Sequence, residues 1–171
     1  GAINTLVLNR RHAAEFGLWF CLGEADADAL HDRLLASGNG LGPVGEHALE
    51  AARITTGTPR YGIDYGADML LPETGLDRIA SHPEKGCYVG QEVVTRMGQR
   101  GVPKRALRGI LWKGAVAPVA GTTLRIDGVR CGHTASVTWS IAEDAPLQMA
   151  YLGRKVRRPG QVLQLTWEGG A

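Results

Sequence analysis

Hydrophobic and polar positions follow two different patterns along the chain, and the change falls near residue 100. Before it, short apolar runs alternate with stretches in which apolar residues recur at helical spacing. After it, short runs separated by glycine and proline turns dominate. The pattern predicts an α+β protein with an α/β domain at 1–99 and a small antiparallel barrel or sandwich at 100–171.

In the first part, the runs at 5–8 and 17–22 predict two strands, and the second is so apolar that we expect a central strand. A helix is predicted from Ala25 or Asp26 to about Ala36, and a second one from Val44 or Gly45 to Ile54. Between them stands a literal G-x-G-x-x-G at 40–45. It follows a helix and not a strand, so we interpret it as a helix–helix loop and not as a dinucleotide site.

In the second part, Asp127-Gly128 separates two short extended runs, which is typical of a two-residue type I′ hairpin turn. Residues 136–141 alternate strictly between hydroxyl and apolar side chains, the period of a half-buried strand. Five strands are predicted in all: 105–112, 122–127, 134–141, 147–152 and 161–167.

Overall charge says little about partners, because 19 basic and 17 acidic residues leave a net charge of +2. The stretch 93–126 nevertheless holds seven basic residues and no acid. It is either a solvated basic face or a site for an anionic ligand, such as a cofactor with a glutamate tail. Nucleic acid is a weaker alternative, since the aromatic residues are few and do not interleave with the basic ones. We therefore expect no nucleic-acid partner.

The three cysteines, Cys21, Cys87 and Cys131, are widely spaced and form no C-x-x-C pattern, so we expect no metal site. Free thiols and the lack of a leader-like segment lead us to expect a cytoplasmic protein. No apolar run is long enough to span a bilayer, and we expect no membrane partner. Glycine makes up 24 of 171 residues, about twice its usual share of about 7%, which fits many turns.

The stretch K-G-C-Y-V-G-Q-E at 85–92 is the strongest candidate for chemistry. Gly86 and Gly90 permit a tight turn or a close approach to a ligand, and helical spacing begins at about Glu92. A cysteine beside a lysine and a helix start forms a thiolate more readily than a free one. The alternative is that Cys87 is a small, half-buried hydrophobic residue.

K-G-C-Y-x-G-Q-E, followed by two valines and Arg96, resembles the signature of the YgfZ family, folate-binding relatives of the glycine cleavage T-protein. A second similarity is a helical arginine, Arg53, ahead of G-x-P-x-x-G-x-D at 57–64. Residues 70–77 and 132–163 also resemble family segments, and the family ends in a β-barrel. The resemblance therefore implies a partial T-protein-like α/β domain followed by a C-terminal β-barrel.

The resemblance covers only the rear portion of the family. Full-length members carry a further portion ahead of it, which forms much of the folate cavity and, in true aminomethyltransferases, supplies the catalytic aspartate. By resemblance, the cofactor is tetrahydrofolate. The residues matched to its binding are Arg53, Tyr61 and Arg96. Arg53 could equally form an ion pair with a local acid, and charge alone suggests that a folate tail lies over Arg96, Arg100 or Lys104.

The leading hypothesis is a tetrahydrofolate-binding YgfZ-type protein that supports iron–sulfur cluster assembly or repair through the Cys87 thiol. Lys85, Gln91 and Glu92 are the supporting groups, with Glu92 as a hydrogen-bond acceptor for the turn that holds Cys87 or simply a first-turn helix acid. The expected partners are the folate small molecule and iron–sulfur client or assembly proteins. The alternative is a tetrahydrofolate-dependent aminomethyltransferase of the T-protein type, and a third class is a protein-binding module.

Overall fold

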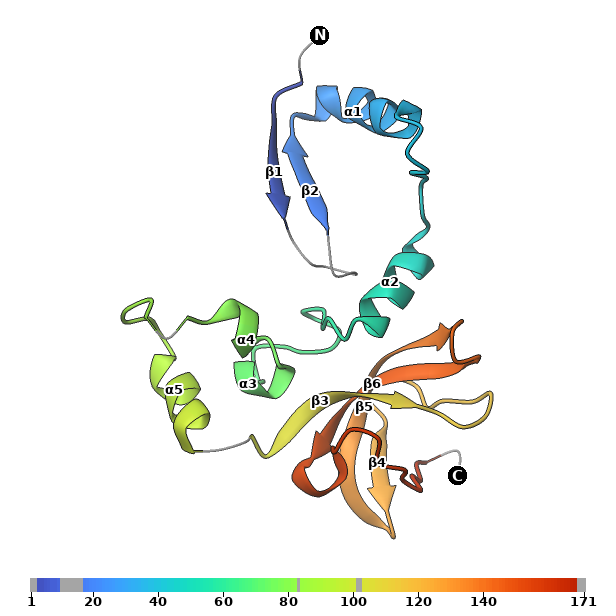
Figure 1. Cartoon of the computed structure of the whole chain (residues 1–171). Helices are drawn as coiled ribbons and strands as arrows, with labels where there is room; N and C mark the ends of the chain where they lie inside the picture. Colours follow the sequence, from blue (N-terminus) through green and yellow to red (C-terminus); the bar gives the residue numbers. More distant parts are fainter. Residues whose placement is uncertain (1–2, 10–16, 83, 101–102, 169–171) are drawn as a thin grey trace. The chain divides into compact units, whose positions relative to one another are not determined.

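The computed structural model describes residues 3–9, 17–82, 84–100 and 103–168, without the side chains of 98–100 (Figure 1). It is a mixed α/β structure with two antiparallel sheets. The chain divides into two compact units, Gly1–Thr58 and Pro59–Ala171. Each unit is described by itself.

The first unit contains β1 (Thr5–Asn9), β2 (Leu18–Leu22), α1 (Glu24–Ala36) and α2 (Glu46–Thr55). All four elements confirm the predicted ones, and the G-x-G-x-x-G stretch is a loop that ends at the start of α2. The strands form an antiparallel pair with Leu6 opposite Cys21. The prediction of a central β2 is wrong within the described residues, because the sheet has two strands and Trp19 is 45% exposed.

A buried ion pair holds the end of α2. Arg53 is fully buried, and its Nε and Nη2 donate to the two carboxylate oxygens of Glu50 at 3.0 and 2.7 Å. Its Nη1 donates to the carbonyl of Thr58 at 2.7 Å, just past the helix. Through these hydrogen bonds the guanidinium joins the last turns of α2 to Thr58, and the bidentate geometry is the strong form of an Arg–carboxylate pair.

The second unit begins with loops and three helices: α3 (Leu71–Thr74), α4 (Asp77–Ala80) and α5 (Gln91–Arg100). The predicted helix after the cysteine motif is thus confirmed as α5. Gly75, with a φ of +78°, ends α3 in the left-handed region that favours glycine. None of the described helices has the length and apolar character that crossing a bilayer requires.

The rest of this unit is a four-stranded antiparallel sheet of β3 (Arg105–Leu111), β4 (Thr123–Ile126), β5 (Val129–Ser140) and β6 (Ala145–Gly153), drawn yellow to red in Figure 1. The strand order is β3-β6-β5-β4. Four of the five predicted strands are confirmed. The fifth, 161–167, contributes an isolated bridge between Thr166 and Arg125. A closed barrel is not seen among the described residues, so closure stays a prediction.

The turn between β4 and β5 confirms the predicted hairpin. Asp127 and Gly128 have φ angles of 50° and 75°, and Ile126 pairs directly with Val129. Two consecutive positive φ angles define the type I′ turn, whose twist matches that of the flanking strands.

The core of the sheet is apolar with one polar network at its centre. Trp112, Leu124, Ala150 and Leu152 form the buried apolar cluster. Beside it, fully buried Gln148 accepts a hydrogen bond from Trp112 Nε1 at 3.0 Å and donates to the Pro118 carbonyl at 2.8 Å. Every polar group of that amide has a partner, as burial requires.

A buried carboxylate connects the loop at the start of the unit to the sheet. Asp64 is 2% exposed, its Oδ2 accepts from the Arg60 amide, and its Oδ1 accepts from the Ser136 amide, both at 2.9 Å. The pairing of β5 with β6 shifts register between Thr134 and Val137. Such a bulge leaves a backbone amide out of the ladder, and here Asp64 supplies its acceptor.

A second carboxylate connects α3 to the first residue of β3. Glu73 is 8% exposed and accepts from Arg105 Nε at 3.0 Å and from Nη2 at 3.2 Å, which raises the pKa of Arg105. Contacts of this kind group residues 59–99 with the sheet. The compact units therefore divide after Thr58, whereas the domain boundary at 99/100 stays a prediction.

We expect Asp64→Asn to lower the free energy of unfolding of the second unit by about 1–3 kcal/mol, because one of the two amides that donate to this carboxylate loses its acceptor. Urea unfolding followed by tryptophan fluorescence measures it. Asp127→Asn is the matched control, since it makes the same change at an exposed turn position that accepts asparagine. Equal stability of the two variants would contradict the role given to Asp64.

We expect Glu50→Gln to lower the free energy of opening of α2 by about 2–3 kcal/mol. Breaking a fully buried ion pair costs ~3–5 kcal/mol, and the cost is smaller here because the Glu50 side chain is 24% exposed. The change removes the negative charge of Glu50, whose carboxylate lies 2.7 Å from the buried Arg53 guanidinium. Amide hydrogen exchange in α2 reports the loss. Glu24→Gln, an exposed acid in the first turn of α1, serves as the control and costs a few tenths of a kcal/mol.

Candidate functional site

The cysteine motif forms an exposed turn between α4 and α5. Gly86 and Gly90 both have a φ of +87°, a conformation that other residues rarely adopt, so each glycine of the motif is needed for the turn. The Tyr88 amide donates to Gln91 Oε1 at 3.3 Å, and the Gln91 amide donates to the Tyr88 carbonyl at 3.2 Å. Gln91 thus closes the turn as the first residue of α5.

Cys87 lies at the outside of this turn and is exposed. The alternative of a half-buried packing residue is therefore wrong for the described structure. Lys85 is also exposed, and its Nζ lies 5.8 Å from the centre of the Tyr88 ring. The thiol is accessible to a reagent or a partner, with a lysine two residues away in sequence.

Of the two polar residues expected to support Cys87, Gln91 shapes the turn and Glu92 faces solvent. The acceptor for the turn is Gln91, not Glu92 as expected for that role. Glu92 is exposed in the first turn of α5, where an acid stabilises a helix through the helix dipole. A catalytic part for Glu92 stays a prediction.

The other two cysteines differ from Cys87 in their surroundings. Cys21 is exposed on β2, whereas Cys131 is half-buried, and its burial raises the pKa of that thiol. Within the part of the chain that the structure describes, no group of three or more His, Cys, Asp or Glu side chains could hold a metal ion.

The residues matched to folate binding occupy different settings. Arg53 forms the ion pair with Glu50, which confirms the local-acid interpretation of this residue. Tyr61 is 65% exposed, with its ring edge-on to Tyr65 at 5.4 Å. Arg96 is exposed on α5, and the side chain of Arg100 lies outside the described residues. Arg53 belongs to the first unit and Tyr61 and Arg96 to the second, so each is placed only within its own unit.

A stacked group of side chains in the second unit was not predicted. His133 lies on the buried Tyr151 ring at 5.1 Å and 15°, and the Arg105 guanidinium lies 5.5 Å from the same ring. Burial raises the pKa of Tyr151, with the charge of Asp64 adding to it. Burial and the nearby arginines lower the pKa of His133. Both rings are therefore neutral at neutral pH. This suits a structural role in which the stacked rings support Arg105, the residue that pairs with Glu73.

The sequence contained only a weak signal for this group. His133 and Tyr151 are register partners on β5 and β6, and a register is known only once the bulge in β5 is known.

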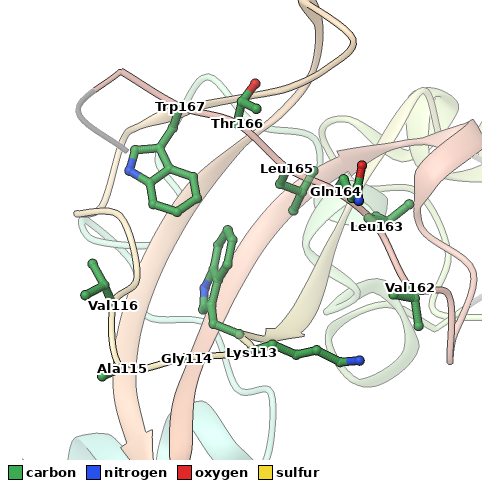
Figure 2. Close-up of a pocket in the computed structure, with 11 residues that line it drawn as sticks. Lys113, Gly114, Ala115, Val116, Val162, Leu163, Gln164, Leu165, Thr166 and Trp167 are labelled. Carbon is green, nitrogen blue, oxygen red and sulfur yellow. The ribbon is translucent and has the colours of Figure 1, made fainter. Parts of the chain in front are cut away.

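A cavity of the second unit lies elsewhere, against the C-terminal segment. It measures about 800 Å³ and is lined by residues 112–116 and 162–167 (Figure 2). Trp112 and Trp167 meet in it edge to face, with ring centres 5.2 Å apart. None of the predicted site residues lines it. The cavity therefore does not help to place the cysteine motif or the folate residues.

Curated proteins similar to this chain include aminomethyltransferases and dimethylglycine dehydrogenases. No family profile matches the chain. An aminomethyltransferase of Saccharopolyspora erythraea is 28% identical over 163 residues, covering 94% of this chain and 44% of that protein. One from Acidobacterium capsulatum is 30% identical over 111 residues, covering 63% of this chain and 29% of the relative. A mitochondrial dimethylglycine dehydrogenase of Mus musculus is 22% identical over 142 residues, covering 82% of this chain and 16% of that protein.

Among solved structures, the glycine cleavage system aminomethyltransferase T from Bartonella henselae has the same fold. The TM-score is 0.75 at 23% identity, covering 92% of this chain and 44% of that one. The chain spans less than half the length of the curated relatives that it matches. Fold and sequence similarity together support the glycine cleavage T-protein-like superfamily for this chain, and no one family within it.

Proposed function

We propose that the chain acts as part of a tetrahydrofolate-dependent aminomethyltransferase of the T-protein type. The observation that carries this proposal is the similarity to an aminomethyltransferase over 94% of the chain. It outweighs the shorter cysteine motif, which favours a YgfZ-type protein over eight residues. In true aminomethyltransferases the catalytic aspartate lies in the portion ahead of the region that this chain resembles. The proposal therefore concerns the full-length natural protein.

The residues present can hold a folate in a limited way. Tyr61 offers an exposed ring for a flat pterin, and Arg96 offers an exposed positive charge for a carboxylate tail. Arg53 is bound to Glu50 and Thr58, so its part is to hold the end of α2 in position. When bound, tetrahydrofolate accepts the one-carbon unit.

The test is turnover by the full-length natural protein with an aminomethyl thioether donor. Tetrahydrofolate should take the carbon as methylene-tetrahydrofolate, and the nitrogen should leave as ammonia while the sulfur leaves as the free thiol. We expect ammonia release that requires tetrahydrofolate. We expect Arg96→Ala to raise KM for a polyglutamylated folate more than for a monoglutamyl one, because exposed charges act mainly on a charged tail. Absence of folate-dependent ammonia release would contradict the proposal.

The second candidate is the YgfZ-type function, support of iron–sulfur cluster assembly or repair with client or assembly proteins as partners. The observation that favours it is the exposed Cys87, presented by a turn whose two glycines both need positive φ angles. An exposed thiol can be oxidised, form a mixed disulfide or ligate a metal transiently. Folate binding is common to both candidates.

Cys87→Ser in the full-length protein separates the candidates. Under the YgfZ-type function, the variant should fail to restore iron–sulfur enzyme activity in cells that lack the natural protein. Cys21→Ser, at another exposed cysteine, should restore it fully. If Cys87→Ser restores activity as well as the control does, the thiol has no such function. Folate-dependent ammonia release should be equal in both variants under the first candidate.

A further inference from the structure

A second, smaller cavity lies in the second unit between β3 and the segment that follows β6. It measures about 400 Å³. Its apolar wall includes Ile110, Leu152 and Leu163, and three arginines line it: Arg108, Arg157 and Arg158. None of the described residues that line it is acidic. Val162, Leu163 and Leu165 line both this cavity and the one in Figure 2.

Arg157 is the unusual member of this group. It is only 8% exposed, and its Nη1 has no hydrogen-bond partner among the described residues. A buried donor without an acceptor costs free energy, and a buried charge without an opposite charge costs more. Arginines at such positions are normally paired, so this guanidinium lacks the acceptor that its burial calls for.

The neighbouring charges increase this cost. Arg108 Nε donates to the Arg157 carbonyl at 3.4 Å, which holds the two arginines together. Burial, together with the positive charges of Arg108 and Arg154, lowers the pKa of Arg157. A negative group in the cavity would relieve the repulsion and give the guanidinium an acceptor.

We propose that this cavity binds a small-molecule carboxylate with an apolar body, the carboxylate against Arg157 and the body against Ile110, Leu152 and Leu163. A monocarboxylate fits better than a phosphate. The apolar wall favours an apolar body, and the desolvation of a second negative charge would offset the gain from pairing. Neither Cys87 nor any residue matched to folate lines this cavity, and the proposal does not depend on the proposed function.

Octanoate is the probe, titrated into the full chain by isothermal calorimetry. We expect one site, no measurable binding of the neutral octanamide, and weaker binding of inorganic phosphate than of octanoate. We expect Arg157→Met to weaken octanoate binding at least about tenfold, the loss of one charge-assisted hydrogen bond. Circular dichroism checks that this variant is folded.

Arg158→Glu keeps the test decisive if Arg157→Met does not fold. Arg158 is exposed at the cavity, so its replacement should leave the fold intact while placing a repelling charge beside the carboxylate. Arg130→Glu makes the same change at an exposed arginine outside the cavity and should bind octanoate like the unchanged chain. Equal weakening by both charge reversals, octanamide binding as tight as octanoate binding, or phosphate binding as tight as octanoate binding would each overturn the proposal.

Discussion

The carboxylate of Asp64 is the constraint on which the second unit depends. It accepts one amide from its own loop and one from Ser136, 72 residues further on, and the bond from Ser136 is buried. The bulge in β5 that shifts the register with β6 lies at Ser136, whose amide donates to this carboxylate. The loop that presents Tyr61 is therefore fixed to the sheet by the group that also satisfies the bulge. Glu73 adds a second attachment, to Arg105 at the start of β3.

Local signals in the sequence were enough to predict most elements. Helical spacing with an acid in the first turn predicted α1 and α5. Asp127-Gly128 predicted a type I′ turn, which requires positive φ angles at both residues. The alternation at 136–141 predicted a strand but not its faces. Ser136 and Ser140 are buried while Val137 and Trp139 are exposed, the reverse of the usual arrangement.

Contacts between distant residues could not be predicted, and they decide the setting of each candidate site. Nothing near Glu73 in the sequence indicates Arg105, and His133 meets Tyr151 only through the shifted register. The Cys87 turn was predicted well because its glycines and helix start are local. The preference between the two candidate functions depends on the length of the similarity and not on these contacts. A short motif favours the YgfZ type, whereas similarity along nearly the whole chain favours an aminomethyltransferase fold.

Both functional candidates require that the protein binds tetrahydrofolate, so binding is the most direct measurement. Isothermal calorimetry on the full-length natural protein should give one site for tetrahydrofolate. Binding should be weakened by Tyr61→Ala, which removes an exposed ring, and not by Tyr88→Ala, which removes a ring beside Lys85 in the cysteine turn. Saturable binding with this difference would support a T-protein-like folate site. No heat of binding with active, folded protein would contradict the account at its centre.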